Sequence, residues 1–367
     1  MKTFFSSWWI VLLIFFSFVI AAIYLRYLSI WTIVQYYSYI HHPEKFNTET
    51  TAQIGDTIGG TTAPFIALLA GFLTFIAFWA QLRANNQVQD QFKLQQFESQ
   101  FFEMIRLHKE NINEMKIAGY SYLTATTISK SDGNETISRT QIERSIEGRK
   151  VFVSMVKELN ACFAVCKSCG DKFNIPQGDL KEIAYRLFFF GSFSSLIDDH
   201  GHVDFIAACR VKLKEIRIEH KDTFGGKKEF LVGGQNVDLH IKYAPFTGHE
   251  SRLAHYYRHL FSAVKFVVRK EQEQLFTYEK SREYLKIVRA QMSNDEQILL
   301  YHNYISGLGE AWEKSQNRFL SRYRMLHNLP LNRVRFVEAP RLHFRERILE
   351  IKKQSKGNDP MFEWGDE

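Results

Sequence analysis

The chain has little of what marks a secreted or nucleotide-binding protein. It holds four cysteines in 367 residues and no disulfide-like framework, as a reducing compartment permits. It also lacks a glycine-rich phosphate loop, an alternating strand–helix pattern and any repeat of about 20–50 residues. These absences argue against a parallel α/β domain and against a repeat protein. What remains is a basic chain of net charge +7 that is unusually rich in phenylalanine, with 32 copies.

Charge is missing from two stretches near the N-terminus. No charged residue lies between Lys2 and Arg26, and none lies in residues 57–82. As a helix, Phe4–Leu25 would rise about 33 Å, enough to cross a hydrocarbon core of about 30 Å, and Ala63–Ala80 is a second run of sufficient length. A cleaved signal peptide is the alternative for the first run, but its single preceding lysine and its length argue against that. The sequence therefore predicts two transmembrane helices in a lipid bilayer.

The polar regions suggest a topology. Two spans joined by a short connection place both termini on the same side of the membrane. The long C-terminal region is basic and carries free cysteines, which indicates the cytoplasm. The predicted organisation is a first transmembrane helix (1–30), a periplasmic loop (31–58), a second transmembrane helix (59–82), a juxtamembrane helix (83–117), a cytoplasmic helical domain (118–350) and a flexible tail (351–367).

The juxtamembrane segment predicts one continuous helix. Residues 81–115 contain no glycine or proline, and an amphipathic face begins at Phe97. Its glutamine-rich first half is either a solvated stalk or a self-association seam. Because a seam would join copies of the chain, a homo-oligomer is expected.

The rest of the chain predicts a mainly α fold with a small β-hairpin. A polar loop is expected at 129–141. Gly233-Gly234 predicts a hairpin within Lys228–Tyr243, and Ser293 with Glu296 forms a capping-box pattern. Periodicity predicts helices at 180–190, 252–268, 280–292 and 295–305.

Two clusters resemble metal sites. The first has the CxxxCxxC spacing of iron–sulfur ligands in radical SAM enzymes, but it lies on a predicted helix with no barrel following, so a buried helix face is the alternative. Its members are Cys162, Cys166 and Cys169. The second is either a solvated turn or a weak metal site. Its members are Asp198, His200, His202 and Asp204. Neither cluster predicts a cofactor.

A run of arginines near the C-terminus could bind RNA or anionic lipid headgroups. A solvated face paired with nearby glutamates is the alternative. The run consists of Arg318, Arg322, Arg324, Arg333, Arg335, Arg341, Arg345 and Arg347.

The segment 249–261, "HESRLAHYYRHLF", predicts a helix with one polar face. Arg252 and His259 on this face have a spacing that resembles the RNA-cutting HEPN domains, whose arginine and histidine act together. The same two residues, with His255, could instead belong to a buried polar network that joins this helix to Arg289 and Gln291.

The strings "GHESRLAHYYRHLFSAVKFV" and "YLKIVRAQMSNDEQILLYHNYIS" resemble the signature of the AbiC-like family of bacterial phage abortive infection proteins. "GDTIGGTTAPFIALLAGF", "FESQFFEMIRLHKENI" and "GRKVFVSMVKEL" resemble the same family. The polar network expected within this family motif consists of Arg252, His255, Tyr256, Arg258, His259, Arg289 and Gln291.

The resemblance implies a role in bacterial antiviral defence and brings no catalytic residues with it. One hypothesis is a non-enzymatic sensor–effector in the inner membrane that responds to a phage-derived trigger and stops or kills the infected cell. The other is a membrane-tethered HEPN-like ribonuclease that uses Arg252 and His259.

Overall fold

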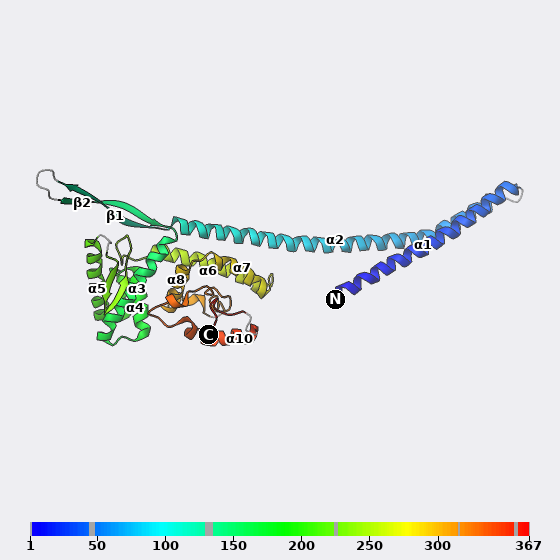
Figure 1. Cartoon of the computed structure of the whole chain (residues 1–367). Coiled ribbons are helices and arrows are strands. Elements are labelled where there is room, and N and C mark those ends of the chain that lie inside the picture. Colours follow the sequence, from blue (N-terminus) through cyan, green and yellow to red (C-terminus); the bar gives the residue numbers. More distant parts are fainter. Residues whose placement is uncertain are drawn as a thin grey trace. The chain divides into compact units, whose positions relative to one another are not determined.

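The computed structural model describes residues 2–43, 48–128, 135–223, 227–314, 316–355 and 359–366. The chain divides into two compact units, Met1–Gln96 and Phe97–Glu367. The fold is mainly helical, as predicted, and the strands of the described residues form two small antiparallel hairpins (Figure 1).

The first unit consists of α1 (Lys2–His41) and the first part of α2 (Thr48–Glu114). Within Val19–His41 and within Thr62–Glu114 these helices are long and apolar enough to cross a membrane. Large side chains of the second stretch are exposed, with Phe65 at 74% and Leu68 at 71%. Lipid would remove this apolar surface from water.

The periplasmic loop expected over 31–58 is too long. Helix α1 continues to His41 and α2 begins at Thr48, so helix covers most of the expected loop. The predicted boundary followed the first charge, Arg26, whereas residues 31–41 remain largely apolar and lie within the candidate span Val19–His41.

Helix α2 continues to Glu114, close to the end expected for the juxtamembrane helix. Its last turns belong to the second unit, where Phe97 and Phe101 are buried. The ring of Phe97 stacks on Phe266 of α6 (Glu250–Gln272) at 5.1 Å and meets Tyr284 of α7 (Tyr278–Ala290) edge-on at 4.9 Å. An aromatic cluster therefore attaches this end of α2 to α6 and α7.

A long hairpin occupies the region where a polar loop was expected. Strand β1 (Lys116–Ile128) pairs with β2 (Glu135–Glu147), with Lys116 opposite Glu147. The expected loop at 129–141 was therefore wrong from residue 135 onward, and its first part lies outside the described residues. Both strands contain Thr and Ile, whose branched side chains favour extended backbone even in a polar sequence.

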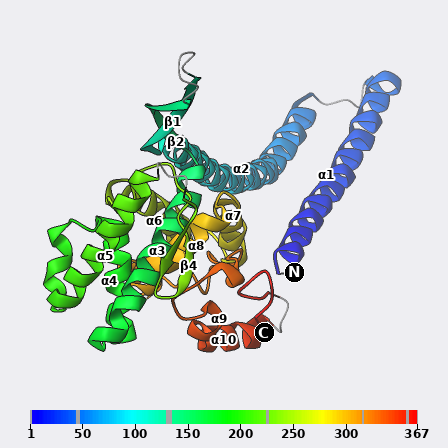
Figure 2. The same ribbon diagram turned by 60° about the vertical axis from the view of Figure 1, so that its left-hand side comes forward.

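The core of the second unit surrounds α3 (Lys150–Phe173). Helices α4 (Gln177–Phe190), α5 (Val203–Asp222) and α8 (Asn294–Ile305) pack against it, and Figure 2 shows them together. The predicted hairpin is confirmed as β3 (Glu229–Val232) and β4 (Gln235–Asp238), and the predicted capping box begins α8. The remaining elements are the 3-10 helices η2 (Ser195–His200), η3 (Glu310–Trp312) and η4 (Leu331–Arg333), and helices α9 (Pro340–His343) and α10 (Arg345–Ser355).

The segment expected as a flexible tail instead packs into the second unit. Helix α10 includes residues 351–355, and Met361 and Phe362 are fully buried. The carboxylate of Asp359 accepts hydrogen bonds from Arg282 at 3.0 Å and from Arg324 at 3.3 Å. Two apolar anchors and a paired carboxylate give this segment the contacts that a free tail lacks.

Candidate functional site

The start of α6 requires glycine. Gly191 and Gly248 have φ angles of 94° and 89°, and a Cβ atom on Gly248 would lie 2.5 Å from the carbonyl oxygen of Phe190. The backbone of His249 then donates a hydrogen bond to Phe189 at 2.7 Å. The motif thus begins with a glycine, Gly248, because two backbone segments lie too close there for a side chain.

Directly after this glycine, His249 forms a fully buried pair with Glu158 of α3. The His249 Nε2 atom lies 3.1 Å from Glu158 Oε2, and Glu158 Oε1 accepts a hydrogen bond from the backbone of Phe246 at 2.7 Å. Sequence reasoning missed Glu158, because an acidic residue on an amphipathic helix is normally exposed. A carboxylate at this depth needs such partners, so the pair holds the start of α6 against α3.

The polar face of α6 divides into residues with separate contacts. The Nε atom of Arg252 donates to the carbonyl oxygen of Lys116, at the base of β1, at 2.7 Å. Arg258 donates to Ala254 one turn earlier in its own helix, and His255 is exposed. Arg252 thus attaches α6 to the long hairpin.

His259 and Tyr256 turn toward α2. Their rings lie 5.7 Å and 5.3 Å from that of His108, which is buried with neither ring nitrogen hydrogen-bonded among the described residues. Burial lowers the pKa of His108 to about 4, and the nearby charges of His259 and Arg149 act in the same direction. His108 is therefore neutral at physiological pH.

A buried carboxyl group lies at the start of α8 near this cluster. The Glu296 Oε2 atom accepts the capping hydrogen bond from Ser293, while Oε1 has no partner among the described residues. Burial raises the pKa of Glu296 to about 7, against the lowering charge of Arg149. Arg149 also donates to the backbone carbonyl of Gln291 at 2.5 Å.

The expected network is not formed as a hydrogen-bonded unit. Among the described residues, no hydrogen bond joins Arg252, His255 or His259 to Arg289 or Gln291. Arg289 instead donates to the carbonyl oxygen of Arg324 at 3.2 Å, and burial lowers its pKa to about 10, followed by the charge of Arg282. Gln291 bonds back to Ile287 of its own helix.

The Asp/His cluster is divided among ordinary ion pairs. Asp198 pairs with Arg210 at 2.7 Å, and His202 pairs with Asp179 at 3.0 Å, while Asp204 is exposed. The side chain of His200 lies outside the described residues. In the part of the chain that the structure describes, no three His, Cys, Asp or Glu residues are grouped to hold a metal ion.

The cysteine run lies on α3 as a packed helix face. Cys162 and Cys166 are fully buried, and burial raises the pKa of both thiols. Cys169 is half-buried near Cys209 of α5. Thiols with raised pKa values remain protonated and are weak nucleophiles and ligands.

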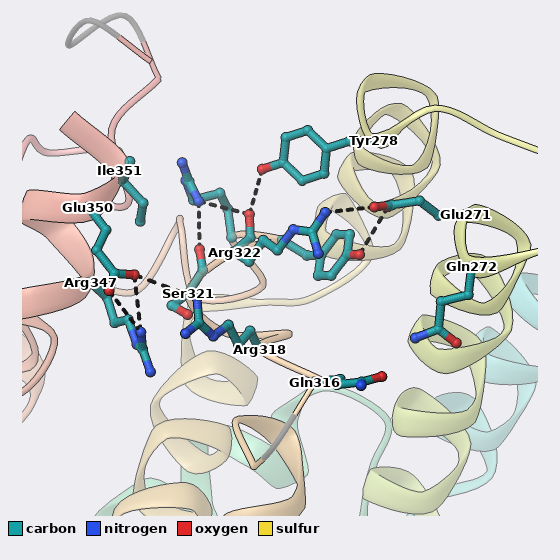
Figure 3. Close-up of a pocket in the computed structure, with 12 residues that line it drawn as sticks. Glu271, Gln272, Tyr278, Gln316, Arg318, Ser321, Arg322, Arg347, Glu350 and Ile351 are labelled. Atoms are coloured by element: carbon teal, nitrogen blue, oxygen red, sulfur yellow. Dashed lines mark hydrogen bonds and ion pairs between the residues drawn. The ribbon is translucent and has the colours of Figure 1, made fainter. Parts of the chain in front are cut away.

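Four of the eight arginines of the C-terminal run meet in one cavity of about 770 Å³, which we call the arginine pocket (Figure 3). One wall comes from the end of α6 and the start of α7, another from the loop 316–324 and a third from α10. Its lining includes Arg318, Arg322, Arg324, Arg347, Glu271, Glu350, Gln272, Tyr278 and Tyr323.

The arginines outside the pocket have other contacts. Arg333 pairs with Asp295 at 2.5 Å, and Arg341 donates to the carbonyl oxygens of Trp364 and Gly365. The side chains of Arg335 and Arg345 are exposed.

Within the pocket, the guanidinium group of Arg322 bonds to Glu271 at 2.7 Å. It lies 5.0 Å from the ring centroid of Tyr278 and 5.2 Å from that of Tyr323. The rings of Tyr278 and Tyr323 lie 5.8 Å apart and are tilted by 52°, so the three side chains form a triangular cation–π cluster. Across the pocket, Arg318 and Arg347 share the carboxylate of Glu350.

Arg347 lies 3.0 Å and Arg318 3.6 Å from Glu350 (Figure 3). Two of the pocket arginines also have left-handed backbones, with φ 42° at Arg318 and 61° at Arg324. Such conformations are costly for residues other than glycine and cluster at functional sites.

Fold and sites together define a mainly helical protein with two candidate membrane-spanning helices. Residues 248–334 match the family model described as "Putative phage abortive infection protein". The match confirms the resemblance inferred from the sequence over this segment, which contains α6, α7, α8 and the loop of the arginine pocket. Neither a curated protein nor a solved structure matches the chain.

Proposed function

We propose that the protein is a membrane-anchored effector of bacterial anti-phage defence, which responds to a phage-derived trigger by killing or arresting the infected cell. The observation that carries the proposal is the family match over residues 248–334. We further propose that it lies in the inner membrane with both termini in the cytoplasm and acts as a homo-oligomer.

Helix α2 supports a physical connection between the second candidate span and α6, the helix at the start of the family match. This one helix contains the second candidate span and, further on, Phe97 and His108. Both residues pack on α6, where the family match begins, through Phe266 and His259. A change in α2 would therefore act directly on the packing of the motif helix.

The ribonuclease alternative receives less support. Arg252 is engaged by the carbonyl of Lys116, and His259 packs on His108. These contacts explain both residues by packing, so we propose a non-enzymatic effector and treat RNA cleavage as an outcome of the test.

The test is infection of bacteria that express the full chain, with phage yield, membrane potential and RNA integrity measured together. We expect protection accompanied by loss of membrane potential while RNA stays intact. A matched variant replaces both candidate spans with an unrelated two-span hairpin and should keep expression and membrane location but lose protection. Protection that survives this exchange, or RNA that is cleaved before the potential falls, would contradict the membrane effector.

A further inference from the structure

We propose that the arginine pocket binds a nucleotide, with its phosphate groups on Arg318 and Arg347 and its base against the exposed Arg322 and the half-buried Tyr278. The inference goes beyond the proposed function, because binding by the purified protein does not depend on protection against phage.

The cavity has the size of a small-molecule site. Its volume of about 770 Å³ lies within the range of about 300–1,000 Å³ typical of ligand pockets. Figure 3 shows Arg347 and Glu350 of α10 on one side and Glu271 and Gln272 of α6 on the other. A ligand between these walls would be enclosed by side chains from three segments of the second unit.

The lining carries an excess of positive charge. Four guanidinium groups line the cavity, against the two carboxylates of Glu271 and Glu350. Because Arg318 and Arg347 share Glu350, part of their hydrogen-bonding capacity remains for another anion. Arginine offers a planar fork of donors that matches the oxygens of a phosphate group.

Arg324 lies behind the wall of the pocket and bonds to the backbone of the loop 316–324. Its residue is only 3% exposed, and its Nη1 and Nη2 atoms donate to Ser321, Arg322 and Asp359. Its Nε atom has no hydrogen-bond partner among the described residues. Because this guanidinium group is buried, it fixes the loop that carries Arg318 and Arg322 instead of contacting a ligand.

The aromatic part of the pocket distinguishes a nucleotide from a simple phosphate. Arg322 lies over the rings of both Tyr278 and Tyr323. Nucleic-acid bases stack on tyrosine rings and on guanidinium planes. Arg322 is exposed and Tyr278 is half-buried, so these two side chains can receive a base in the same cavity as Arg318 and Arg347.

The same geometry disfavours larger anions. A long RNA or a lipid surface is normally met by an extended basic face, whereas this site is a cavity between three segments and carries Glu271 and Glu350 beside its arginines. Those carboxylates would repel a continuous polyanion but can lie beside a small ligand.

The experiment measures equilibrium binding to the full chain purified in detergent. The probes are the four nucleoside triphosphates, adenosine as base without phosphate, tripolyphosphate as phosphate without base, a short single-stranded RNA, and phosphatidylcholine vesicles with or without phosphatidylglycerol. We expect at least one nucleoside triphosphate to bind more tightly than tripolyphosphate, adenosine, RNA or vesicles.

Paired variants locate the site. Arg318→Gln with Arg347→Gln should weaken nucleotide binding by about tenfold or more, because both phosphate contacts are lost. Arg335→Gln with Arg345→Gln removes the same charge outside the pocket and should leave affinity unchanged. Tyr278→Leu should weaken nucleotide binding while tripolyphosphate binding persists.

A conservative surface change keeps the test valid if the arginine variant misfolds. Gln272→Glu adds a negative charge at an exposed lining position and should weaken nucleotide binding, whereas Gln235→Glu on β4 should not. The proposal is overturned if no nucleotide binds, if tripolyphosphate binds as tightly, if only RNA or anionic vesicles bind, or if pocket and control variants lose affinity equally.

Discussion

The imidazole rings of His108 and His259 lie stacked with their centroids 5.7 Å apart, one on α2 and the other on α6. His259 belongs to the string that carries the family resemblance, whereas His108 belongs to the helix that contains the second candidate span. A residue with the spacing of a catalytic histidine therefore contacts the helix that contains the second candidate span.

His259→Ala tests whether this contact is structural. The variant removes a half-buried ring from the face of His108. It should lower the free energy of unfolding by about 1 kcal/mol or more, and the melting temperature with it. Arg252→Ala should do the same, because the Lys116 carbonyl loses its donor, while the exposed Arg258→Ala serves as control. Normal melting and membrane levels for both His259→Ala and Arg252→Ala, with protection lost, would instead favour the ribonuclease.

The pH dependence of stability should reveal two opposing groups. The pKa of His108 falls from 6.5 to about 4 on folding, so the unfolded state takes up a proton first, and His108 lowers stability as pH drops from about 6.5 to 4. The pKa of Glu296 rises from 4.5 to about 7, so the folded state holds the proton, and Glu296 raises stability as pH drops from about 7 to 4.5.

Single substitutions separate these effects. Glu296→Gln keeps an acceptor for Ser293 but cannot titrate, so its stability should fall more steeply than wild type between pH 6.5 and 5, by up to about 1 kcal/mol per pH unit. His108→Leu should fall less steeply than wild type over the same range. Melting curves of the full chain in detergent at several pH values measure both slopes. Slopes equal to that of wild type would rule out these two groups as the source.

Removing His249 should destabilise the second unit strongly. His249→Ala removes one of the hydrogen-bond partners of the fully buried Glu158 and leaves the backbone of Phe246, at a cost of about 3 kcal/mol. Glu158→Gln retains an acceptor and should cost less. The exposed His240→Ala is the matched histidine control. Comparable melting temperatures for His249→Ala and His240→Ala would contradict the buried pair.

Asp359→Asn should show that the C-terminal segment is part of the fold. The change removes the carboxylate that faces Arg282 and Arg324, both largely buried, and should cost about 2–4 kcal/mol. Limited proteolysis should then cut residues 351–366 faster than in wild type. Asp204→Asn, at an exposed position, should change neither stability nor cleavage.

The predicted topology can be measured directly. A reporter fused after Leu82 should behave as cytoplasmic, and one inserted near Thr48 as periplasmic, because the basic C-terminal region is expected to stay inside. The opposite pattern would reverse the orientation argued from charge and cysteine use.

Local signals predicted much of the fold. The uncharged stretches, the capping box at Ser293 and the paired glycines at 233–234 each act over a few residues, and the structure has the candidate spans, helix and hairpin that they predict. The hairpin of β1 and β2 was missed, because its strands mix polar and branched residues and only their pairing makes them regular.

The sites depend on contacts that no local pattern contains. Glu158 and His249 are 91 residues apart, and each alone resembles an ordinary surface residue on a helix. The arginine run was visible as composition, but nothing in its spacing separates Arg318 and Arg347, which line the pocket, from Arg335 and Arg345, which do not. That division follows from where the loop 316–324 meets α10.

The ion pairs of Asp359 with Arg282 and Arg324 can form only late in synthesis of the chain. Asp359 is made 77 residues after Arg282 and 35 after Arg324, so both guanidinium groups lack this carboxylate while the ribosome translates the intervening chain. The apolar stretches of α1 and α2 are made before either arginine. The two candidate spans are therefore synthesised before the helical unit has the counterion that Arg282 and Arg324 need.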